Sequence, residues 1–415
     1  MSRVFHGWKV VAACFCIAVV AWTLGLFGAS VYLQAITSAH GWPTAGVSSA
    51  ITLFYLVAAL LQPSVGRALD RFGPRPVMSV GAVSMGTGAA LLGQVSAPWQ
   101  LYPCFVLIGI GWSTLSTTGI SATVAPWFER HQGRSITLAI MGASVAAIAG
   151  VPALLGLVSA LGLARGLAAA GAIAVLVLLP LVWRMLRHRG PAALGLARDG
   201  DAPLPPGAAA PKPPVPLATS VARPGWLLWS AAAGFALGLN VQIGFVTHHV
   251  ALAVPSLGVV GAGLLVSATG VTALLGRLVL ARIVDRMDVR RTAALAMLAQ
   301  AAGLVAVASM PTVPVLIAAS LVYGYCIGHV TTLAPIVVRR EFGAAAFGRI
   351  YGTAAVPIQL TSAFGPALLG ALRDGFGGYA PGLVIAAGLT VAGATALLVG
   401  RRLAGASSAH HARAA

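Results

Sequence analysis

GRALDRFGPR, residues 66–75, is the stretch of sequence that decides the fold. It lies between two apolar runs, and a related charged turn, ARIVDRMDVR, stands at residues 281–290 between two others. The two turns are 215 residues apart, so Asp70 corresponds to Asp285. A charged turn repeated at this distance indicates a chain built from two halves with the same organisation.

The composition is that of a membrane protein. Of the 415 residues, 58% are hydrophobic and only 8% are charged. A soluble domain needs more polar surface than this to meet water. The net charge of +18 would suit a nucleic-acid partner. However, the basic residues occur in short bursts between apolar runs, without the aromatic-rich basic patch of a nucleic-acid-binding surface. We therefore predict an all-α membrane protein with no nucleic-acid partner.

Twelve apolar runs have the length of about 20 residues that a helix needs to cross a bilayer. The predicted spans are 8–33, 44–65, 76–96, 99–124, 134–160, 163–186, 225–250, 257–281, 292–310, 313–338, 346–372 and 379–400. The first run is too long for a cleaved signal peptide and lacks a small-residue cleavage site, so we expect it to remain as a helix.

The basic residues predict the orientation of these spans. If the N-terminus is cytoplasmic, the outer connections contain only Arg165 and Arg373. Arg277 lies inside an apolar stretch, whereas the remaining Lys and Arg residues fall in the inner connections, in the termini or at the inner edges of the spans. Because basic residues accumulate on the cytoplasmic side, both termini are predicted to be cytoplasmic, in a bacterial inner (plasma) membrane. Anionic lipid of the inner leaflet is then a neighbour of the basic connections.

Four segments follow from these patterns. Residues 1–186 are predicted to form an N-terminal six-helix bundle, and residues 225–403 a C-terminal one. Between them, residues 187–224 are rich in Pro with Ala and Gly, which predicts a mobile cytoplasmic linker without a core of its own. Residues 404–415 are predicted to be a disordered tail.

Arg277 is the strongest candidate for a functional residue. A cation at membrane depth costs at least about 2.5 kcal/mol, so it needs a partner or a task. The nearest acidic residues in the sequence, Asp285 and Asp288, come two to three turns later at the end of the segment. We therefore predict that Arg277 binds an anionic substrate. The alternative is a structural charge satisfied by backbone carbonyl groups or by a pose that reaches the interface.

The chain resembles the major facilitator superfamily over nearly its whole length. The loop motif of that family has the form G-x-x-x-D-R-x-G-x-R, and residues 66–75 match it at every fixed position. The second copy departs from the motif at Ala281 and Asp288. The resemblance implies twelve transmembrane helices in two pseudo-symmetric six-helix bundles, with a substrate site near the middle of the membrane. It also implies a monomer.

A conformational latch is the role that we expect for the charged turns. Asp70 lies at a helix end, where its carboxylate is able to accept from the N-terminal amides of a neighbouring helix and to pair with an arginine there. The alternative is a solvated turn that only fixes the topology. The latch residues are Gly66, Asp70, Arg71, Gly73 and Arg75 in the first half and Asp285 and Arg286 in the second.

Three further stretches resemble monocarboxylate porters and bacterial oxalate/formate-antiporter-like proteins. They are GWKVV at 7–11, WFERHQGRS at 127–135 and Gly276-Arg277. The second stretch is similar to the family's W-F-x-x-R-x-G-x-A signature at the opening of helix 5, and it departs from that signature at His131, where Arg is usual, and at Ser135, where Ala is usual. In that group the arginine of the third stretch binds the substrate carboxylate, so the resemblance implies this role for Arg277.

One arginine favours a monocarboxylate over a dicarboxylate. Residues 351–369 contain no Lys, Arg or His, where the oxalate exchanger has a second basic residue, and a dianion beside one guanidinium keeps a buried charge uncompensated. Ala273 replaces the Asp of animal monocarboxylate porters, so their proton-coupling scheme is not carried over. We predict a secondary active transporter of a small monocarboxylate, with symport, exchange and uniport left open. The alternatives are an anion exchanger of the oxalate/formate type and an exporter of drugs or other amphiphiles.

Other polar residues inside the predicted spans are candidates to line the substrate site. They are Asn240, His248 and His249 on the seventh span, Tyr323 and His329 on the tenth, Gln359 on the eleventh and Thr114 on the fourth. A histidine is the side-chain candidate for coupling to protons, since it titrates near neutral pH. The alternative for each residue is a hydrogen bond that packs one helix against another.

The sequence offers no support for an enzyme. It contains no HExxH or GxSxG motif and no paired carboxylates within a span, so we predict neither catalytic residues nor a cofactor. The four cysteines, Cys14, Cys16, Cys104 and Cys326, form no CxxC pair, and we predict no metal site. The expected partners are a small organic anion, membrane lipid and, if transport is coupled, protons.

Overall fold

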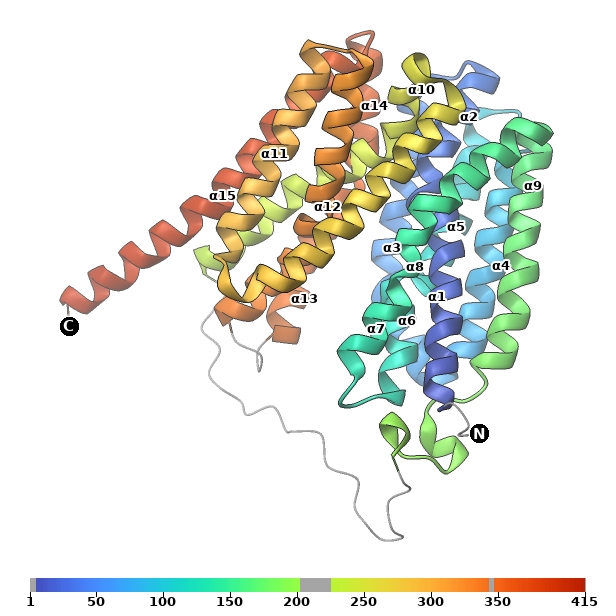
Figure 1. The fold of residues 1–415 in the computed structure, drawn as a ribbon, viewed down its shortest axis with the longest axis horizontal. Helices are drawn as coiled ribbons and strands as arrows, with labels where there is room; N and C mark the ends of the chain where they lie inside the picture. Colours follow the sequence, from blue (N-terminus) through green and yellow to red (C-terminus); the bar gives the residue numbers. More distant parts are fainter. Residues whose placement is uncertain (1–4, 202–224, 343–346, 415) are drawn as a thin grey trace. The chain divides into compact units, whose positions relative to one another are not determined.

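The computed structural model describes residues 5–201, 225–342 and 347–414, and within these ranges every regular element is a helix (Figure 1). The chain separates into two compact units, Met1–Lys212 and Pro213–Ala415. The boundary falls inside the Pro-rich segment 187–224.

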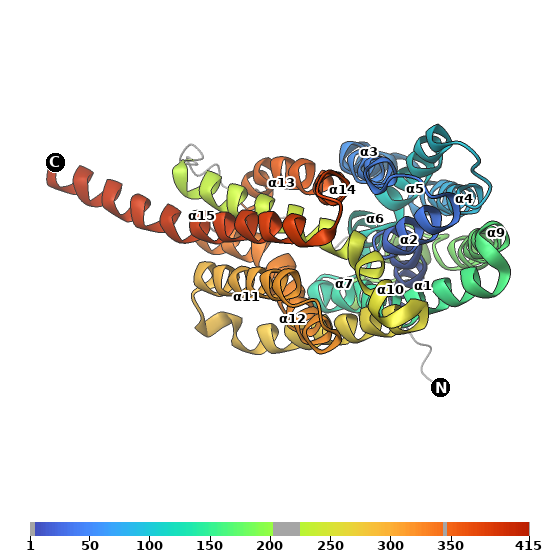
Figure 2. The same ribbon diagram turned by 90° about the horizontal axis from the view of Figure 1, so that it is seen from above.

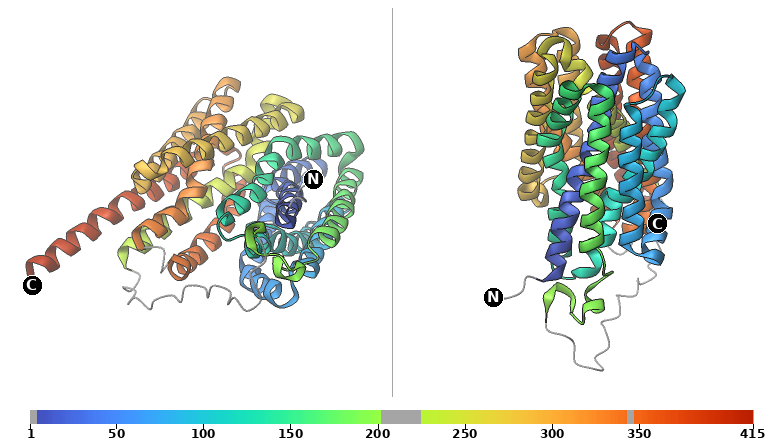
Figure 3. Two further views of the ribbon diagram at one scale, coloured as in Figure 1. Left: turned by 60° about the horizontal axis from the view of Figure 1, so that its bottom comes forward. Right: turned by 90° about the vertical axis from the view of Figure 1, so that its right-hand side faces the viewer.

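The N-terminal unit contains nine α-helices within its described residues. They are α1 (His6–Leu24), α2 (Gly28–His40), α3 (Thr44–Phe72), α4 (Pro74–Leu92), α5 (Leu101–Leu115), α6 (Thr117–Val124), α7 (Gln132–Ile140), α8 (Gly142–Val145) and α9 (Val151–Met185). In the packing of this unit, α4 contacts both α5 and α9 (Figure 3, with α4 in light blue and α9 in green).

The charged turn at residues 66–75 separates α3 from α4. Gly73 ends α3 with a φ of 84°, a conformation that glycine adopts without a steric penalty. Pro74 then begins α4, where the missing N–H of proline leaves no helical hydrogen bond unmade. The Gly-Pro pair thus reverses the chain between two predicted spans.

The C-terminal unit contains six α-helices within its described residues. They are α10 (Trp226–Ile283), α11 (Val289–Ser309), α12 (Val313–Phe342), α13 (Phe347–Ala363), α14 (Gly365–Gly375) and α15 (Tyr379–Ala414). Helices α10, α11, α12 and α15 lie side by side (Figure 2). Buried apolar side chains such as Phe235, Met297 and Leu333 form the core of this unit.

Nine helical stretches of the described residues are long and apolar enough to cross a membrane. Two of them, Gln132–Met185 and Trp226–Arg286, each contain two predicted spans. These stretches turn at Gly162 and Gly258, whose φ angles are 80° and 67°. The remaining predicted span is α4, which is richer in Gly, Ser and Pro than the other spans. All twelve predicted spans therefore lie on helices, and the predicted fold class is confirmed.

The structure describes part of each of the two segments that the sequence predicted to be irregular. Residues 187–201 include two short turns, Pro191–Leu194 and Arg198–Gly200, that belong to the N-terminal unit, whereas the sequence predicted a mobile linker. The rest of that linker, residues 202–224, lies outside the described residues. Helix α15 continues to Ala414, where the sequence predicted a disordered tail from residue 404.

Candidate functional site

Arg277 lies in the second half of α10, where this helix packs against α12. Glycines allow a close approach at this crossing. A Cβ atom added to Gly328 would stand 2.8 Å from the backbone nitrogen of Arg277 and 3.2 Å from its Cγ. A Cβ added to Gly276 would collide with the carbonyl oxygen of Tyr325. The stem of the partly buried Arg277 therefore lies directly over α12.

His329 borders the same crossing from α12. Its Nδ1 would lie 3.3 Å from a Cβ added to Gly276, and it is 3.0 Å from the carbonyl oxygen of Tyr325. The His329 and Tyr325 rings also pack together, with 4.8 Å between their centroids. The structure thus brings two of the predicted site residues, Arg277 and His329, to one contact between two helices.

His249 and Tyr323 form a second group between α10 and α12. Phe245 lies between them, with its ring centroid 4.8 Å from that of His249 and 4.1 Å from that of Tyr323. Nε2 of His249 is 3.0 Å from the hydroxyl of Ser320. Both predicted site residues are buried, and their rings pack the two helices together.

His248 has hydrogen-bond partners for both ring nitrogens. Nε2 is 3.1 Å from the carbonyl oxygen of Pro366, and Nδ1 is 3.0 Å from the hydroxyl of Tyr379. Because a carbonyl oxygen only accepts, Nε2 carries the proton and Nδ1 accepts from Tyr379. Asn240 likewise donates its side-chain amide to the carbonyl oxygen of Thr361 at 2.6 Å. These contacts join α10 to α13, α14 and α15 and favour a packing role for both residues.

The last two predicted site residues lie apart from these groups. Gln359 is exposed on α13. Thr114 belongs to the N-terminal unit, where its hydroxyl donates to the carbonyl oxygen of Gly111 at 2.9 Å within α5. The same hydroxyl occupies the space that a Cβ on Gly81 of α4 would take, so Thr114 packs α5 against α4.

The predicted latch residues of the first half surround the α3–α4 turn. Gly66 has open space beside it, and the side chains of Asp70 and Arg71 are exposed. Within the described part of the chain, the Asp70 carboxylate has no hydrogen-bond or ion-pair partner. Instead, the backbone carbonyl groups of Asp70 and Arg71 accept from the guanidinium of Arg189, at 3.3 and 2.9 Å.

The corresponding turn of the second half is held by Arg340 of α12. Its guanidinium donates to the Asp285 carboxylate at 3.0 Å and to the backbone carbonyl groups of Val284 and Met287. Arg286 is exposed. Asp288, at one of the two departures from the motif, caps α11 by accepting from the backbone N–H of Arg290 at 3.1 Å.

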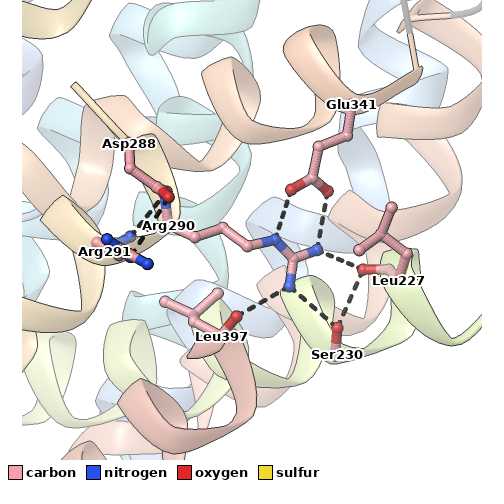
Figure 4. Close-up of polar contacts among 7 residues, drawn as sticks. All are labelled: Leu227, Ser230, Asp288, Arg290, Arg291, Glu341 and Leu397. Carbon is pink, nitrogen blue, oxygen red and sulfur yellow. Dashed lines mark hydrogen bonds and ion pairs between the residues drawn. The ribbon is translucent and has the colours of Figure 1, made fainter. Parts of the chain in front are cut away.

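A buried ion pair lies beside this turn, and it was not predicted from the sequence. Arg290 of α11 donates to both carboxylate oxygens of Glu341 of α12, from Nε at 2.5 Å and from Nη2 at 2.8 Å (Figure 4). It also donates to the hydroxyl of Ser230 and to the carbonyl oxygens of Leu227 and Leu397. One guanidinium therefore joins α10, α11, α12 and α15. The repeat pairs Arg290 with Arg75, but no sequence signal pointed to Glu341.

Asp199 is a second residue that the sequence analysis missed. Its carboxylate accepts from the consecutive backbone N–H groups of Glu129, Arg130 and His131, at 3.0, 2.9 and 3.2 Å. Burial of Asp199 acts to raise the pKa of its carboxyl group, but these three N–H donors outweigh burial and hold the pKa below its ordinary value. Asp199 therefore fastens the start of the Pro-rich segment to the connection that precedes α7.

The polar side chains of the described residues are spread along the helices rather than gathered into one cluster. Within the described residues, no three His, Cys, Asp or Glu side chains gather closely enough to hold a metal ion. The polar groups instead lie along helix–helix contacts inside apolar spans.

The described residues form helices that include all twelve predicted membrane spans. Each half of the chain has a charged turn after its second span. These features define a multi-pass membrane protein with an internal repeat. The family model described as Major Facilitator Superfamily matches residues 13–262 and 250–414. The chain therefore belongs to this superfamily of membrane transporters, as its charged turn at residues 66–75 led us to expect.

Solved structures share the fold at low sequence identity. The inward-facing, occupied crystal structure of a bacterial homolog to the human lysosomal transporter Spinster aligns with a TM-score of 0.75 and 15% identity, over 97% of this chain and 98% of that one. The nucleoside transporter NupG aligns with a TM-score of 0.71 and 13% identity, over 96% and 99%.

Curated relatives match over a shorter region. The multidrug resistance protein MdtH of Shigella dysenteriae is 31% identical over 110 residues, which is 26% of this chain and 27% of that protein. MdtH of Yersinia enterocolitica is 32% identical over 111 residues, again 26% and 27%. The chain spans about a quarter of the length of these relatives.

Proposed function

We propose that this protein is a secondary active transporter that moves a small monocarboxylate across the membrane by alternating access. Arg277 binds the carboxylate group, and the apolar side chains of the surrounding spans accept the organic remainder. The observation that carries the proposal is an arginine inside an apolar span, with its backbone nitrogen and Cγ packed at the crossing of α10 and α12. Binding of an anion offsets the free-energy cost of placing this cation at membrane depth.

The packing around Arg277 supports this role. The glycines at 276 and 328 remove the side chains that would otherwise separate α10 from α12, so the stem of Arg277 has a fixed position. A binding group held by its surroundings loses little entropy when the substrate arrives. His329, at the same crossing, is the histidine that we propose for coupling to protons. Both ring nitrogens of His248 are used in packing, which argues against that residue.

The charged turns fit a role in the transport cycle. We propose that both termini face the cytoplasm and that the turns at residues 66–75 and 281–290 act there as the latch between the halves. The exposed carboxylate of Asp70 is the group that would form such a contact. Arg340 would act on the second turn, since it already joins that turn to α12.

Substitution of Arg277 tests the carboxylate site. We expect Arg277→Ala to lower uptake of short radiolabelled monocarboxylates into proteoliposomes by roughly ten- to a hundredfold, the value of a charged hydrogen bond. Arg277→Lys should recover part of the loss, because it restores the charge but not the planar fork. The matched control is Arg165→Ala, an exposed arginine of α9 that lies outside both charged turns. Uptake that is equal in Arg277→Ala and in the control would refute the proposal.

An exporter of drugs or other amphiphiles is the second candidate, favoured by the similarity to the multidrug resistance protein MdtH. A thermal-unfolding screen of the purified protein separates the two candidates. Monocarboxylates should stabilise a carboxylate transporter, whereas neutral amides of the same size should not. Stabilisation by hydrophobic cations alone would favour the exporter, and stabilisation by dicarboxylates would favour an exchanger of the oxalate/formate type.

A further inference from the structure

A shallow groove runs along the surface of the N-terminal unit between α4 and α9. Its lining residues are Ser79, Val80, Val83, Ser84, Leu179, Pro180 and Trp183. Apolar side chains dominate this lining, and Val80, Val83 and Trp183 are exposed, Trp183 by 54%. An open apolar groove on the side of a membrane helix pair meets lipid tails rather than water.

A cation stands at one end of this groove. The guanidinium carbon of Arg75, in the first turn of α4, lies 3.9 Å from the centre of the Trp183 ring. Trp183 is itself held in place, because its Nε1 donates to the hydroxyl of Ser79 at 3.0 Å, and that hydroxyl donates to the carbonyl oxygen of Arg75 at 2.7 Å. Aromatic stacking of this kind fixes an arginine without neutralising its charge.

The charge of Arg75 is not balanced by a carboxylate in the described part of the chain, where the salt bridges involve other residues. Its buried Nε also has no hydrogen-bond acceptor among the described residues. Two further arginines, Arg184 and Arg187, are exposed at the same end of α9. The open end of the groove is therefore strongly basic.

The length of the groove suits part of one lipid molecule within a single leaflet. Arg75 and Ser84 are separated by nine residues of helix, or about 13 Å at 1.5 Å per residue. Arg75 and Trp183 lie where α4 begins and α9 ends, at the side predicted to face the cytoplasm. Tryptophan and arginine are characteristic of the headgroup level of a membrane. The apolar remainder of the groove then extends into the acyl region.

We propose that this groove is a binding site for one acidic phospholipid of the inner leaflet. Its phosphate is bound by Arg75 over the Trp183 ring, and one acyl chain lies along Val80, Val83 and Pro180. A soluble anion would use the arginine but leave the apolar lining unfilled. A zwitterionic lipid would fill the lining but bring its own cation to a basic cluster, so the charge of the site selects an acidic headgroup.

Quenching of tryptophan fluorescence by brominated lipid tests the site in the full chain. The probes are phosphatidylglycerol and phosphatidylcholine with brominated acyl chains, added at equal low fractions to nanodiscs. The contribution of Trp183 is the difference between the wild-type protein and Trp183→Phe. We expect about fivefold higher occupancy by phosphatidylglycerol, the preference that one basic residue gives at an acidic membrane surface. Equal quenching by both lipids would overturn the proposal.

Two variants with one charge removed make the test specific. Arg75→Gln should abolish the preference, whereas Arg67→Gln should retain it, because Arg67 is an exposed arginine of α3 whose guanidinium donates to Ser64. A preference that survives in Arg75→Gln, or that is lost equally in both variants, would refute the assignment. Millimolar inorganic phosphate should not reduce the quenching by phosphatidylglycerol, and a loss under phosphate would mean a site for free anions.

Native mass spectrometry supplies a measurement that does not depend on Trp183→Phe. The wild-type protein should retain one phosphatidylglycerol after mild detergent removal, and Arg75→Gln should retain about fivefold less. Retention that is equal in the two proteins would overturn the proposal, even if Trp183→Phe failed to fold.

Discussion

The ion pair between Arg290 and Glu341 is the contact of the C-terminal unit whose loss should be most easily measured. The Arg290 side chain is 2% exposed and that of Glu341 is 17% exposed. Replacing Glu341 with Ala leaves a buried guanidinium without its counter-charge, a change that costs about 3–5 kcal/mol in folding free energy. Three neutral acceptors, on Ser230, Leu227 and Leu397, remain on Arg290. We therefore expect the lower end of this range, about 3 kcal/mol.

The assay is reversible unfolding of the purified protein in mixed micelles of mild detergent and SDS, followed by tryptophan fluorescence. The matched control is Glu129→Ala. The Glu129 carboxylate is 59% exposed and lies 3.7 Å from Arg198, so the loss of this surface pair should cost less than about 1 kcal/mol. Glu341→Gln should fall between the two variants, because the amide keeps one acceptor for Arg290 but removes the charge. Equal destabilisation by Glu341→Ala and Glu129→Ala would refute the reasoning.

Two further predictions concern single contacts. Asp199→Ala should lower stability by about 1 kcal/mol, the value of a helix N-terminal cap. The pKa of Asp199 in the folded protein lies below its ordinary value of 3.8, so its carboxylate contributes fully to stability above that pH and loses this contribution as the pH falls below it. The thermal unfolding temperatures of the wild-type protein and Asp199→Ala should therefore differ at pH 7 and converge at strongly acidic pH. Gly328→Ala should cost about 1–3 kcal/mol and reduce transport, because its Cβ would press on the backbone of Arg277, which cannot move aside cheaply. The control is Gly388→Ala, which has open space and should be neutral or slightly stabilising; equal effects of the two substitutions on unfolding and uptake would contradict the close crossing of α10 and α12.

The helices themselves were predictable because the bilayer imposes a length and a polarity on each one. Apolar runs bounded by charged turns predicted all twelve spans, and the charged turn at residues 66–75 is where the structure ends α3 and begins α4. The same reasoning did not predict the two short turns within residues 187–201. Their Pro and Gly content predicts a chain that cannot build a core, which is true of the segment alone. Its order comes from Asp199, which uses backbone N–H groups about 70 residues earlier in the chain.

The polar groups of the candidate site were less predictable than the helices, because their roles depend on partners in other helices. The sequence ranked His248 with His249 and His329, and no local pattern distinguishes the three. In the structure, Pro366 and Tyr379 satisfy both ring nitrogens of His248, whereas His329 stands beside Arg277 at a crossing without intervening side chains.

Glu341 is a residue whose role depends on a partner in another helix and which the sequence did not single out. It is one of only eight acidic residues in the chain, and its neighbours in the sequence, Arg339 and Arg340, suggest an ordinary charged helix end. Its partner is Arg290, 51 residues away and nearly inaccessible. In a chain with so few carboxylates, each buried one has to neutralise a specific cation, since an unpaired charge in a span is costly. The sequence of a membrane protein therefore does not show which carboxylate pairs with which cation, and the structure supplies these pairings. Arg75 occupies the position of Arg290 in the first repeat, and no carboxylate of the described residues pairs with it, which is why we assign its charge to lipid.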